Sequence, residues 1–154
     1  MELVGYDLDG TICQRGEMSK SFFHCTGEER RAFYKAREDH YRTTEVIRTP
    51  QEAHWVVITS RKNKYRKLTL DWLSEKNLKP QQVYFMEGYA RVRREMIEYK
   101  SKWINELGLC KYYEDDPKIV SALKRKCPNA TIVLCESAGR IVDIDNFKNT
   151  TLLF

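Results

Sequence analysis

The sequence predicts an α/β fold: a single Rossmann-like domain in which helices cover both faces of a central, mostly parallel sheet, giving three α/β/α layers. Short apolar runs of strand length alternate along the chain with amphipathic stretches of helical spacing, as in β-α-β crossovers. The 154 residues fit one domain. Hydrophobic residues make up 42% of the chain and charged residues 32%, which excludes a disordered chain. We therefore expect residues 1–154 to form one domain.

Five short apolar runs are expected to form the strands. They cover residues 3–6, 55–58, 83–85, 112–113 and 131–134. Runs of this length that are apolar throughout are typical of strands buried on both faces. Because helical stretches separate the runs, each strand should be followed by a crossover, and the strands should be parallel.

Helices are expected between these runs. The capping box from Thr26 to Glu29 predicts the start of a strongly charged helix. Ser101 is a candidate cap for a later helix, and Asp116-Pro117 is a typical helix start, with Asp as N-cap and Pro in the first position. The expected helices cover residues 27–42, 65–77, 102–107 and 117–127, and the basic segment 87–99 is left unassigned.

Polar residues follow three of the expected strands: DLDGT at 7–11, TSR at 59–61 and EDD at 114–116. In an open parallel sheet, ligands bind outside the carboxyl ends of the strands. If these three strands are neighbours, four or five carboxylates face one crevice, which is unfavourable unless protons or a cation neutralise them. All-oxygen ligands favour Mg²⁺ over zinc.

These segments resemble the haloacid dehalogenase (HAD) superfamily. DLDGT at 7–11 is similar to its first motif, DxDGT, and ITS at 58–60 to its second, a Thr or Ser that closes a strand. YEDDP at 113–117 is similar to its acidic fourth motif, which opens a helix. The resemblance covers residues 1–134, and it implies a HAD-like hydrolase of the phosphatase type.

The third motif of that superfamily is a lysine at a helix N-terminus, and Lys100 and Lys102 both match it by position. We prefer Lys100, because apolar residues three, four and seven positions later place it on the inward face of a helix. Lys102 would point to solvent. The spacing alone does not decide between them.

The resemblance implies catalysis through an aspartyl-phosphate. Asp7 would be the nucleophile, and Asp9 the acid–base residue that protonates the leaving oxygen and later deprotonates water. Mg²⁺ would bind the Asp7 carboxylate, the Asp9 backbone carbonyl and Asp115, and Asp116 is a further expected metal-binding residue. Which of Glu114, Asp115 and Asp116 is the direct ligand stays open. Asp116 also has the capping role available.

The resemblance also implies a phosphate site around the nucleophile. Its expected members are the side chains of Thr59, Ser60 and Lys100 and the backbone amides near Leu8 and Gly10. A glycine at position 10 would allow the chain to turn sharply below the phosphate.

The short gaps between these motifs leave little room for a cap domain. The segment from about residue 12 to residue 50 holds only a flap and a small helical insert. We expect its helix at 27–42 to act as a miniature lid. A capless or minimally capped site suits a large substrate, such as a nucleotide or a nucleic-acid end, besides phosphorylated small molecules. The residues expected at its rim are Arg61, Lys64 and Arg91, with Tyr65 and Tyr89 placed to stack on a base. A solvated helix face is the alternative explanation of these basic residues.

Two other functions stay open. A phosphotransferase of the same fold would pass the phosphoryl group to an acceptor other than water, and an inactive member of the fold would bind nucleic acid through its net charge of +5. The sequence has no run long enough to span a membrane and no recognisable signal peptide. Its five cysteines, without a CxxC spacing, are typical of free thiols. We expect a cytoplasmic protein without a membrane partner.

Overall fold

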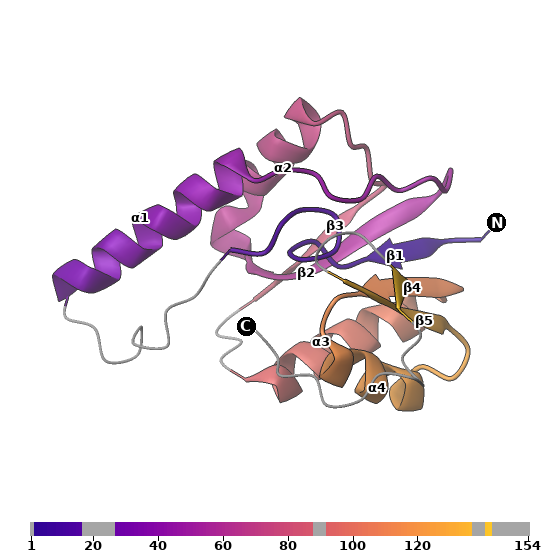
Figure 1. Ribbon diagram of the computed structural model, residues 1–154. Coiled ribbons are helices and arrows are strands. Elements are labelled where there is room, and N and C mark those ends of the chain that lie inside the picture. Colours follow the sequence, from indigo (N-terminus) through magenta and orange to yellow (C-terminus); the bar gives the residue numbers. More distant parts are fainter. Residues whose placement is uncertain (1, 17–26, 88–91, 137–140, 143–154) are drawn as a thin grey trace.

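The computed structural model describes residues 2–16, 27–87, 92–136 and 141–142, and of the last two only the backbone. Within these residues the elements are β1 (Val4–Tyr6), α1 (Gly27–Thr43), β2 (Trp55–Lys62), the 3₁₀ turn η2 (Asn63–Tyr65), α2 (Arg66–Glu75), β3 (Val83–Met86), α3 (Arg93–Glu106), β4 (Lys111–Glu114), α4 (Pro117–Lys126), β5 (Thr131–Cys135) and β6 (Ile141–Val142). Figure 1 shows their arrangement.

The sheet has the order β3-β2-β1-β4-β5-β6, with β1 to β5 parallel and β6 antiparallel to β5. The predicted α/β fold with a mostly parallel sheet is confirmed. Because β2, β1 and β4 are parallel neighbours, the three polar segments at or near their carboxyl ends lie on the same side of the sheet. The sequence did not predict β6, whose two residues are too few to show a periodicity.

Two hydrophobic cores lie on opposite faces of the sheet, since successive strand residues point to opposite sides. On one face Trp72 of α2 is buried together with Val57 of β2. On the other, Ile104 of α3 and Leu123 of α4 are buried with Ile58. Burying a side chain of this size stabilises the fold by about 1.5–3 kcal/mol. In Figure 1, α2 accordingly lies on one side of the sheet, and α3 and α4 on the other.

Helix α1 differs from the other helices because none of its residues is buried. It extends away from the sheet in Figure 1, and its bounds agree with the predicted helix at 27–42. Its C-terminal end is anchored, since the Trp72 indole Nε1 donates to the carbonyl of Thr44 at 3.1 Å. Tyr41 also packs edge-on against Tyr65, with 5.2 Å between ring centroids.

Two predicted boundaries are wrong. Strand β2 runs on to Lys62, so residues 59–61 belong to the strand and do not follow it. Helix α3 begins at Arg93, and Ser101 lies inside it, where its Oγ donates to the Glu98 carbonyl at 3.1 Å. The start of α3 was hidden because charged residues dominate its first two turns. The predicted start of α4 is confirmed: Asp116 is the N-cap, and Pro117 follows it.

None of the helices in the described ranges is long and apolar enough to cross a membrane.

Candidate active site

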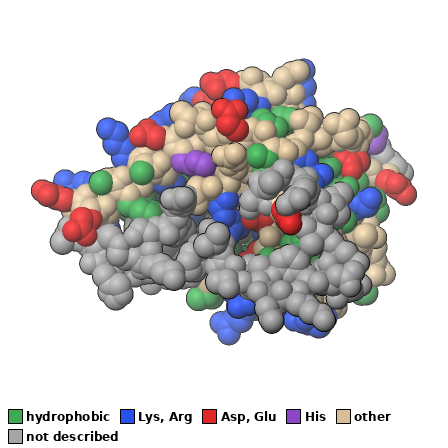
Figure 2. Space-filling model, in the orientation of Figure 1, with side chains coloured by type: hydrophobic (Ala, Val, Ile, Leu, Met, Phe, Trp, Pro, Cys, Tyr) green, Lys and Arg blue, Asp and Glu red, His purple; other side chains and the backbone are tan. Residues whose placement is uncertain are grey.

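Three carboxylates gather where β1 and β4 end. Asp7 follows β1, Glu114 is the last residue of β4, and Asp115 comes next. One carboxylate oxygen from each lies within 4.8 Å of the others. The backbone brings them together because β1 and β4 are paired in parallel, with Tyr6 opposite Tyr113. In Figure 2, acidic and basic side chains meet near the middle of the face that is shown.

Lys100 reaches this carboxylate cluster from α3. Its Nζ donates to Asp7 Oδ1 at 3.1 Å and to Glu114 Oε2 at 2.6 Å, and its side chain is only 3% exposed. Ile104, one turn later, is buried on the same side of the helix, whereas Lys102 is exposed. The structure therefore places Lys100, and not Lys102, against Asp7. Contrary to the prediction, Lys100 lies in the second half of α3 and not at a helix N-terminus.

The cluster divides its charge unevenly. Burial and the nearby Glu114 charge raise the pKa of Asp7 to about 7, although Lys100 opposes this shift. Burial would also raise the pKa of Glu114, but the Lys100 ammonium outweighs burial and holds it below its usual value. Burial and repulsion by Asp7 and Glu114 raise the pKa of Asp115 well above its usual value. The cluster is thus short of positive charge.

Both carboxylate oxygens of Glu114 accept hydrogen bonds. Its Oε2 also accepts from the Tyr112 hydroxyl at 3.3 Å, and its Oε1 accepts from the backbone N–H groups of Asp115 and Asp116 at 3.2 and 3.4 Å. With Lys100 included, four donors fix this buried carboxylate. Glu114 therefore holds Lys100 and the start of α4 in place, besides contributing negative charge.

Asp115 faces an arginine that the motifs did not indicate. Arg15 Nη2 lies 3.2 Å from Asp115 Oδ2 and 3.3 Å from Oδ1. Gly10, with φ of 86°, lies so close to Asp115 that a Cβ at position 10 would overlap its carboxylate. The glycine is therefore required both for its backbone conformation and for the approach of Asp115.

The loop after β1 is closed by its own backbone. The carbonyl of Leu8 accepts from the amides of Ile12 and Cys13 at 2.9 and 3.1 Å, and the Gly10 amide donates to the Cys13 carbonyl at 2.7 Å. The expectation that the Gly10 amide binds phosphate is therefore wrong for this arrangement, because that donor is occupied. The structure shows no use for the Thr11 hydroxyl, which is buried without a partner among the described residues.

Asp9 lies apart from the carboxylate cluster, in a pair with Arg61. Arg61 Nε donates to Asp9 Oδ2 at 2.9 Å and Nη2 to Oδ1 at 2.7 Å. Burial would raise the pKa of Asp9, but the charge and hydrogen bonds of Arg61 outweigh it and hold the pKa below its usual value. Arg61 is buried, so the prediction that it lies at a substrate rim is wrong. Its pairing with Asp9 compensates the guanidinium charge and so allows Arg61 to be buried.

The other residues of the predicted phosphate site and rim are placed as follows. Thr59 is buried, and its Oγ1 accepts from the Arg61 amide at 3.1 Å. The Oγ of Ser60 is buried and has no hydrogen-bond partner among the described residues. Lys64 is exposed, 4.8 Å from the Tyr34 ring centroid. Arg91 lies outside the described residues, as does Tyr89.

Asp116 is not a member of the carboxylate cluster. Its Oδ1 accepts from the amides of Lys118 and Ile119 at 2.9 and 3.4 Å, and its Oδ2 pairs with Arg93 at 2.9 Å. The prediction that Asp116 binds the metal is therefore corrected, because capping α4 already uses its carboxylate.

The donor set of the cluster fits Mg²⁺. Asp7, Glu114 and Asp115 offer only carboxylate oxygens, which hard divalent cations prefer. When all three carboxylates are ionised they face only two cations, Lys100 and Arg15, so one negative charge is then uncompensated. Glu114 has four donors, whereas Asp7 accepts from Lys100 and Asp115 pairs with Arg15, so Asp7 and Asp115 would be better able to hold such a cation.

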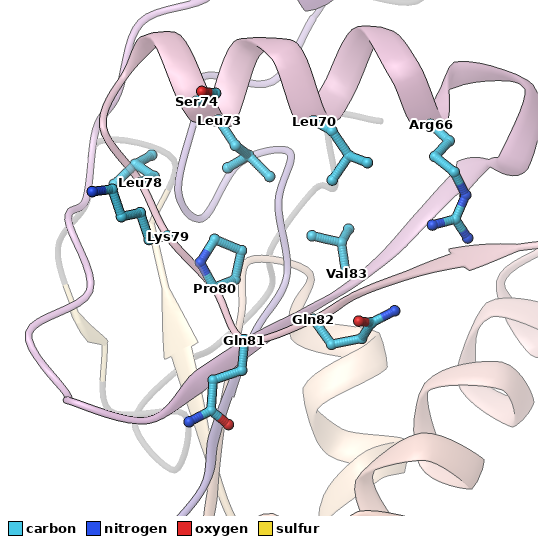
Figure 3. Close-up of a pocket in the computed structure, with 10 residues that line it drawn as sticks. All are labelled: Arg66, Leu70, Leu73, Ser74, Leu78, Lys79, Pro80, Gln81, Gln82 and Val83. Atoms are coloured by element: carbon cyan, nitrogen blue, oxygen red, sulfur yellow. The ribbon is translucent and has the colours of Figure 1, made fainter.

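The groove between α2 and β3 is a separate feature, shown in Figure 3. It has a volume of about 350 Å³, and Leu70 and Leu73 of α2 point into it toward Pro80 and Val83. Its lining is mixed, since Arg66, Lys79 and polar side chains join the apolar ones, but it holds no carboxylate and therefore has no equivalent of Asp7.

No family model matches this sequence, and no curated protein matches it. Solved structures that share its fold include a chain of the Pnkp1/Rnl/Hen1 RNA repair complex, with a TM-score of 0.55 and 15% identity over 86% of this chain and 42% of that one. A chain of a second Pnkp1/Rnl/Hen1 complex has a TM-score of 0.55 and 13% identity over 86% of this chain and 45% of that one. At these identities the likeness shows the fold alone. This protein spans less than half the length of either chain.

Proposed function

We propose that this protein is a Mg²⁺-dependent phosphomonoesterase of the HAD type that acts through an aspartyl-phosphate. One observation carries the proposal: Asp7 lies at the end of the central strand, between a buried lysine and two further carboxylates. Lys100 remains an ammonium there: burial would lower its pKa, but Asp7 and Glu114 outweigh burial and raise it. A nucleophile, a fixed cation and metal-binding oxygens are what phosphoryl transfer requires.

The reaction would proceed in two steps. Asp7, as a carboxylate, attacks phosphorus and forms an aspartyl-phosphate bond while the bond to the ester oxygen breaks. Asp9, whose pKa Arg61 lowers, first takes up a proton from solvent and then gives it to that oxygen. Water then attacks the phosphorus, Asp9 takes its proton, and inorganic phosphate leaves. Mg²⁺, when bound, supplies positive charge that reduces repulsion between Asp7 and the phosphate. Lys100 orients Asp7 throughout.

We further propose a nucleic-acid end as the substrate. The two similar structures come from an RNA repair complex, which agrees with such a substrate. Exposed basic residues after β2 (Lys64, Arg66 and Lys67) suit a polyanion. They lie beyond the end of β2, on the side of the sheet edge where Asp7 lies.

The test is phosphate release from 3′- and 5′-phosphorylated oligonucleotides and from p-nitrophenyl phosphate, with Mg²⁺ or with EDTA. We expect EDTA to abolish release and Asp7→Asn to lower it at least about 10³-fold. Asp71→Asn, at an exposed aspartate of α2, is the matched control and should retain activity. Undiminished release in EDTA or by Asp7→Asn would contradict the proposal. Salt-sensitive binding of the oligonucleotides without turnover would instead indicate a nucleic-acid-binding module, and faster turnover with added alcohol a phosphotransferase.

A further inference from the structure

We propose that α1 belongs to the catalytic machinery, because its Tyr41 and the buried Arg61 together fix the position of the Asp9 carboxylate. This inference rests on the proposed function, in which Asp9 transfers protons. It gives the insert between β1 and β2 a role that its lack of buried residues does not suggest. We call Asp9, Arg61 and Tyr41 the clamp.

The first contact of the clamp is a two-point ion pair. Both Asp9 oxygens accept from Arg61, at 2.7 and 2.9 Å, so the carboxylate plane cannot rotate without breaking a charged hydrogen bond. The Arg61 side chain is 1% exposed, whereas that of Asp9 is 25% exposed. Asp9 thus keeps an open side toward solvent while Arg61 holds it from behind. The lone pairs that Arg61 leaves free on the Asp9 oxygens are available on that open side to a substrate oxygen or to water.

Arg61 is itself held from several directions. Its Nη1 donates to Thr69 Oγ1 of α2 at 3.0 Å, and its Nη2 approaches Cys13 Sγ at 3.7 Å. Its backbone amide donates to Thr59 Oγ1 at 3.1 Å. Every nitrogen of the guanidinium therefore has a partner, and three segments of the chain determine its orientation.

Tyr41 of α1 covers one face of the guanidinium plane, whose N–H groups already have partners. The Arg61 Cζ lies 3.6 Å from the Tyr41 ring centroid, a close cation–π contact. Neighbouring residues tie this end of α1 to the loop after Asp9: His40 Nε2 lies 3.0 Å from the Gln14 carbonyl, and Thr44 Oγ1 donates to the same carbonyl at 3.1 Å. Tyr41 therefore excludes water from the back of Arg61 and limits how far the pair with Asp9 can shift.

The clamp makes a specific kinetic prediction. If Tyr41 positions Asp9 through Arg61, its loss should impair proton transfer to the leaving oxygen more than attack by Asp7. Esters of aliphatic alcohols and nucleosides need that proton, whereas the p-nitrophenolate ion leaves readily without it. A helix that merely stabilised the fold would affect both kinds of substrate alike.

The experiment compares Tyr41→Leu with Tyr41→Phe. Leucine fills space but has no ring face, and phenylalanine keeps the ring face that contacts Arg61. We expect Tyr41→Leu to lower kcat on a phosphorylated oligonucleotide about 10–100-fold, with less than about threefold loss on p-nitrophenyl phosphate. Tyr41→Phe should restore both rates. Thermal unfolding curves of both variants would show that they are folded.

Equal losses on the two substrates, or no loss in Tyr41→Leu, would overturn the clamp while leaving the proposed function intact. A wild-type protein without Mg²⁺-dependent phosphate release would instead contradict the proposed function, and with it the role of Asp9. If Tyr41→Leu fails to fold, Thr69→Val tests the same inference from α2. It removes the acceptor of Arg61 Nη1 and leaves α1 unchanged, and it should give the same selective loss, whereas equal or absent losses would count against the clamp.

Discussion

Asp7 and Asp9 are the same kind of residue two positions apart, yet their surroundings shift their pKa values in opposite directions. Asp7 shares Lys100 with Glu114 and lies beside Asp115, so negative charge exceeds positive charge around it. Asp9 has Arg61 to itself, so its charge is balanced. The pKa of Asp7 is raised by burial and by Glu114, whereas Arg61 overcomes the burial of Asp9 and lowers its pKa.

The difference shows how one loop can hold two aspartates in separate electrostatic surroundings, as the proposed reaction requires. Excess negative charge beside Asp7 provides a place for a divalent cation, which a nucleophile approaching an anionic phosphate needs. The balanced pair at Asp9 requires no cation and favours the carboxylate form, so in the proposed reaction Asp9 takes up a proton before it gives one to the leaving oxygen. The cations come from different elements: Lys100 from α3, and Arg61 from the end of β2. The two surroundings can therefore be changed separately.

The largest effect is expected from Lys100→Ala, which removes the cation that Asp7 and Glu114 share. It would leave Asp7 and Glu114 buried without their shared cation, and removing one partner of a buried pair costs about 3–5 kcal/mol. Urea unfolding should show a loss of this size in the free energy of unfolding. Lys102→Ala, at the exposed neighbour, is the control and should change it by less than about 0.5 kcal/mol. Similar losses in both variants would contradict the assignment of Lys100.

A smaller effect is expected from Gly10→Ala, because Gly10 follows Asp9 in the loop and lies against the Asp115 carboxylate beside Asp7. Alanine at a φ of 86° costs about 1–2 kcal/mol, and its Cβ would displace the Asp115 carboxylate. We expect the rise in melting temperature that Mg²⁺ produces to shrink or vanish in this variant. Gly108→Ala is the matched control, since Gly108 has a φ of 61° but open space around it. It should lose stability and keep the full response to Mg²⁺; a normal Mg²⁺ response in Gly10→Ala would count against Asp115 as a ligand.

A third effect is expected from pH in the absence of Mg²⁺. Asp7 has a pKa of about 7 in the folded chain, above the value of about 3.9 of an unfolded aspartate. Its stabilising contribution is therefore complete below about pH 4 and is lost as the pH rises through about 7. The shift at Asp9 is opposite, so its contribution is lost only as the pH falls below about 4. Asp7→Asn should flatten the decline in unfolding free energy between pH 5 and pH 8; an unchanged decline would point to other groups.

Much of the fold could be predicted, because its strands are short, buried apolar runs that polar residues separate from the helices. The order of polar segments after the strands was also informative, since parallel strands bring their carboxyl ends to one edge. The start of α3 was missed because charged residues dominate its first two turns and hide the apolar periodicity. One of its few inward-facing residues, Lys100, is itself charged and so does not add to that periodicity. For the same reason Lys100 was expected near a helix end and not in mid-helix.

The roles of several site residues depended on contacts between distant segments. Arg61 was expected at the rim, since a cluster of basic residues in sequence gives no sign that one member has a buried partner. Asp9, fifty-two positions earlier, is that partner. Arg15 and Tyr41 carry no motif, and only their contacts with Asp115 and Arg61 reveal them.

The sequence by itself determined the α/β architecture, the acidic segments at the strand ends and the cap of α4, because each depends on residues close together in the chain. The tertiary structure decided which cation pairs with which carboxylate. A buried charge without a partner is costly, so each takes the partner that the packing of strands and helices brings within reach. The arrangement of Lys100 with Asp7 and of Arg61 with Asp9 is set by that packing, and it gives the two aspartates separate cationic partners.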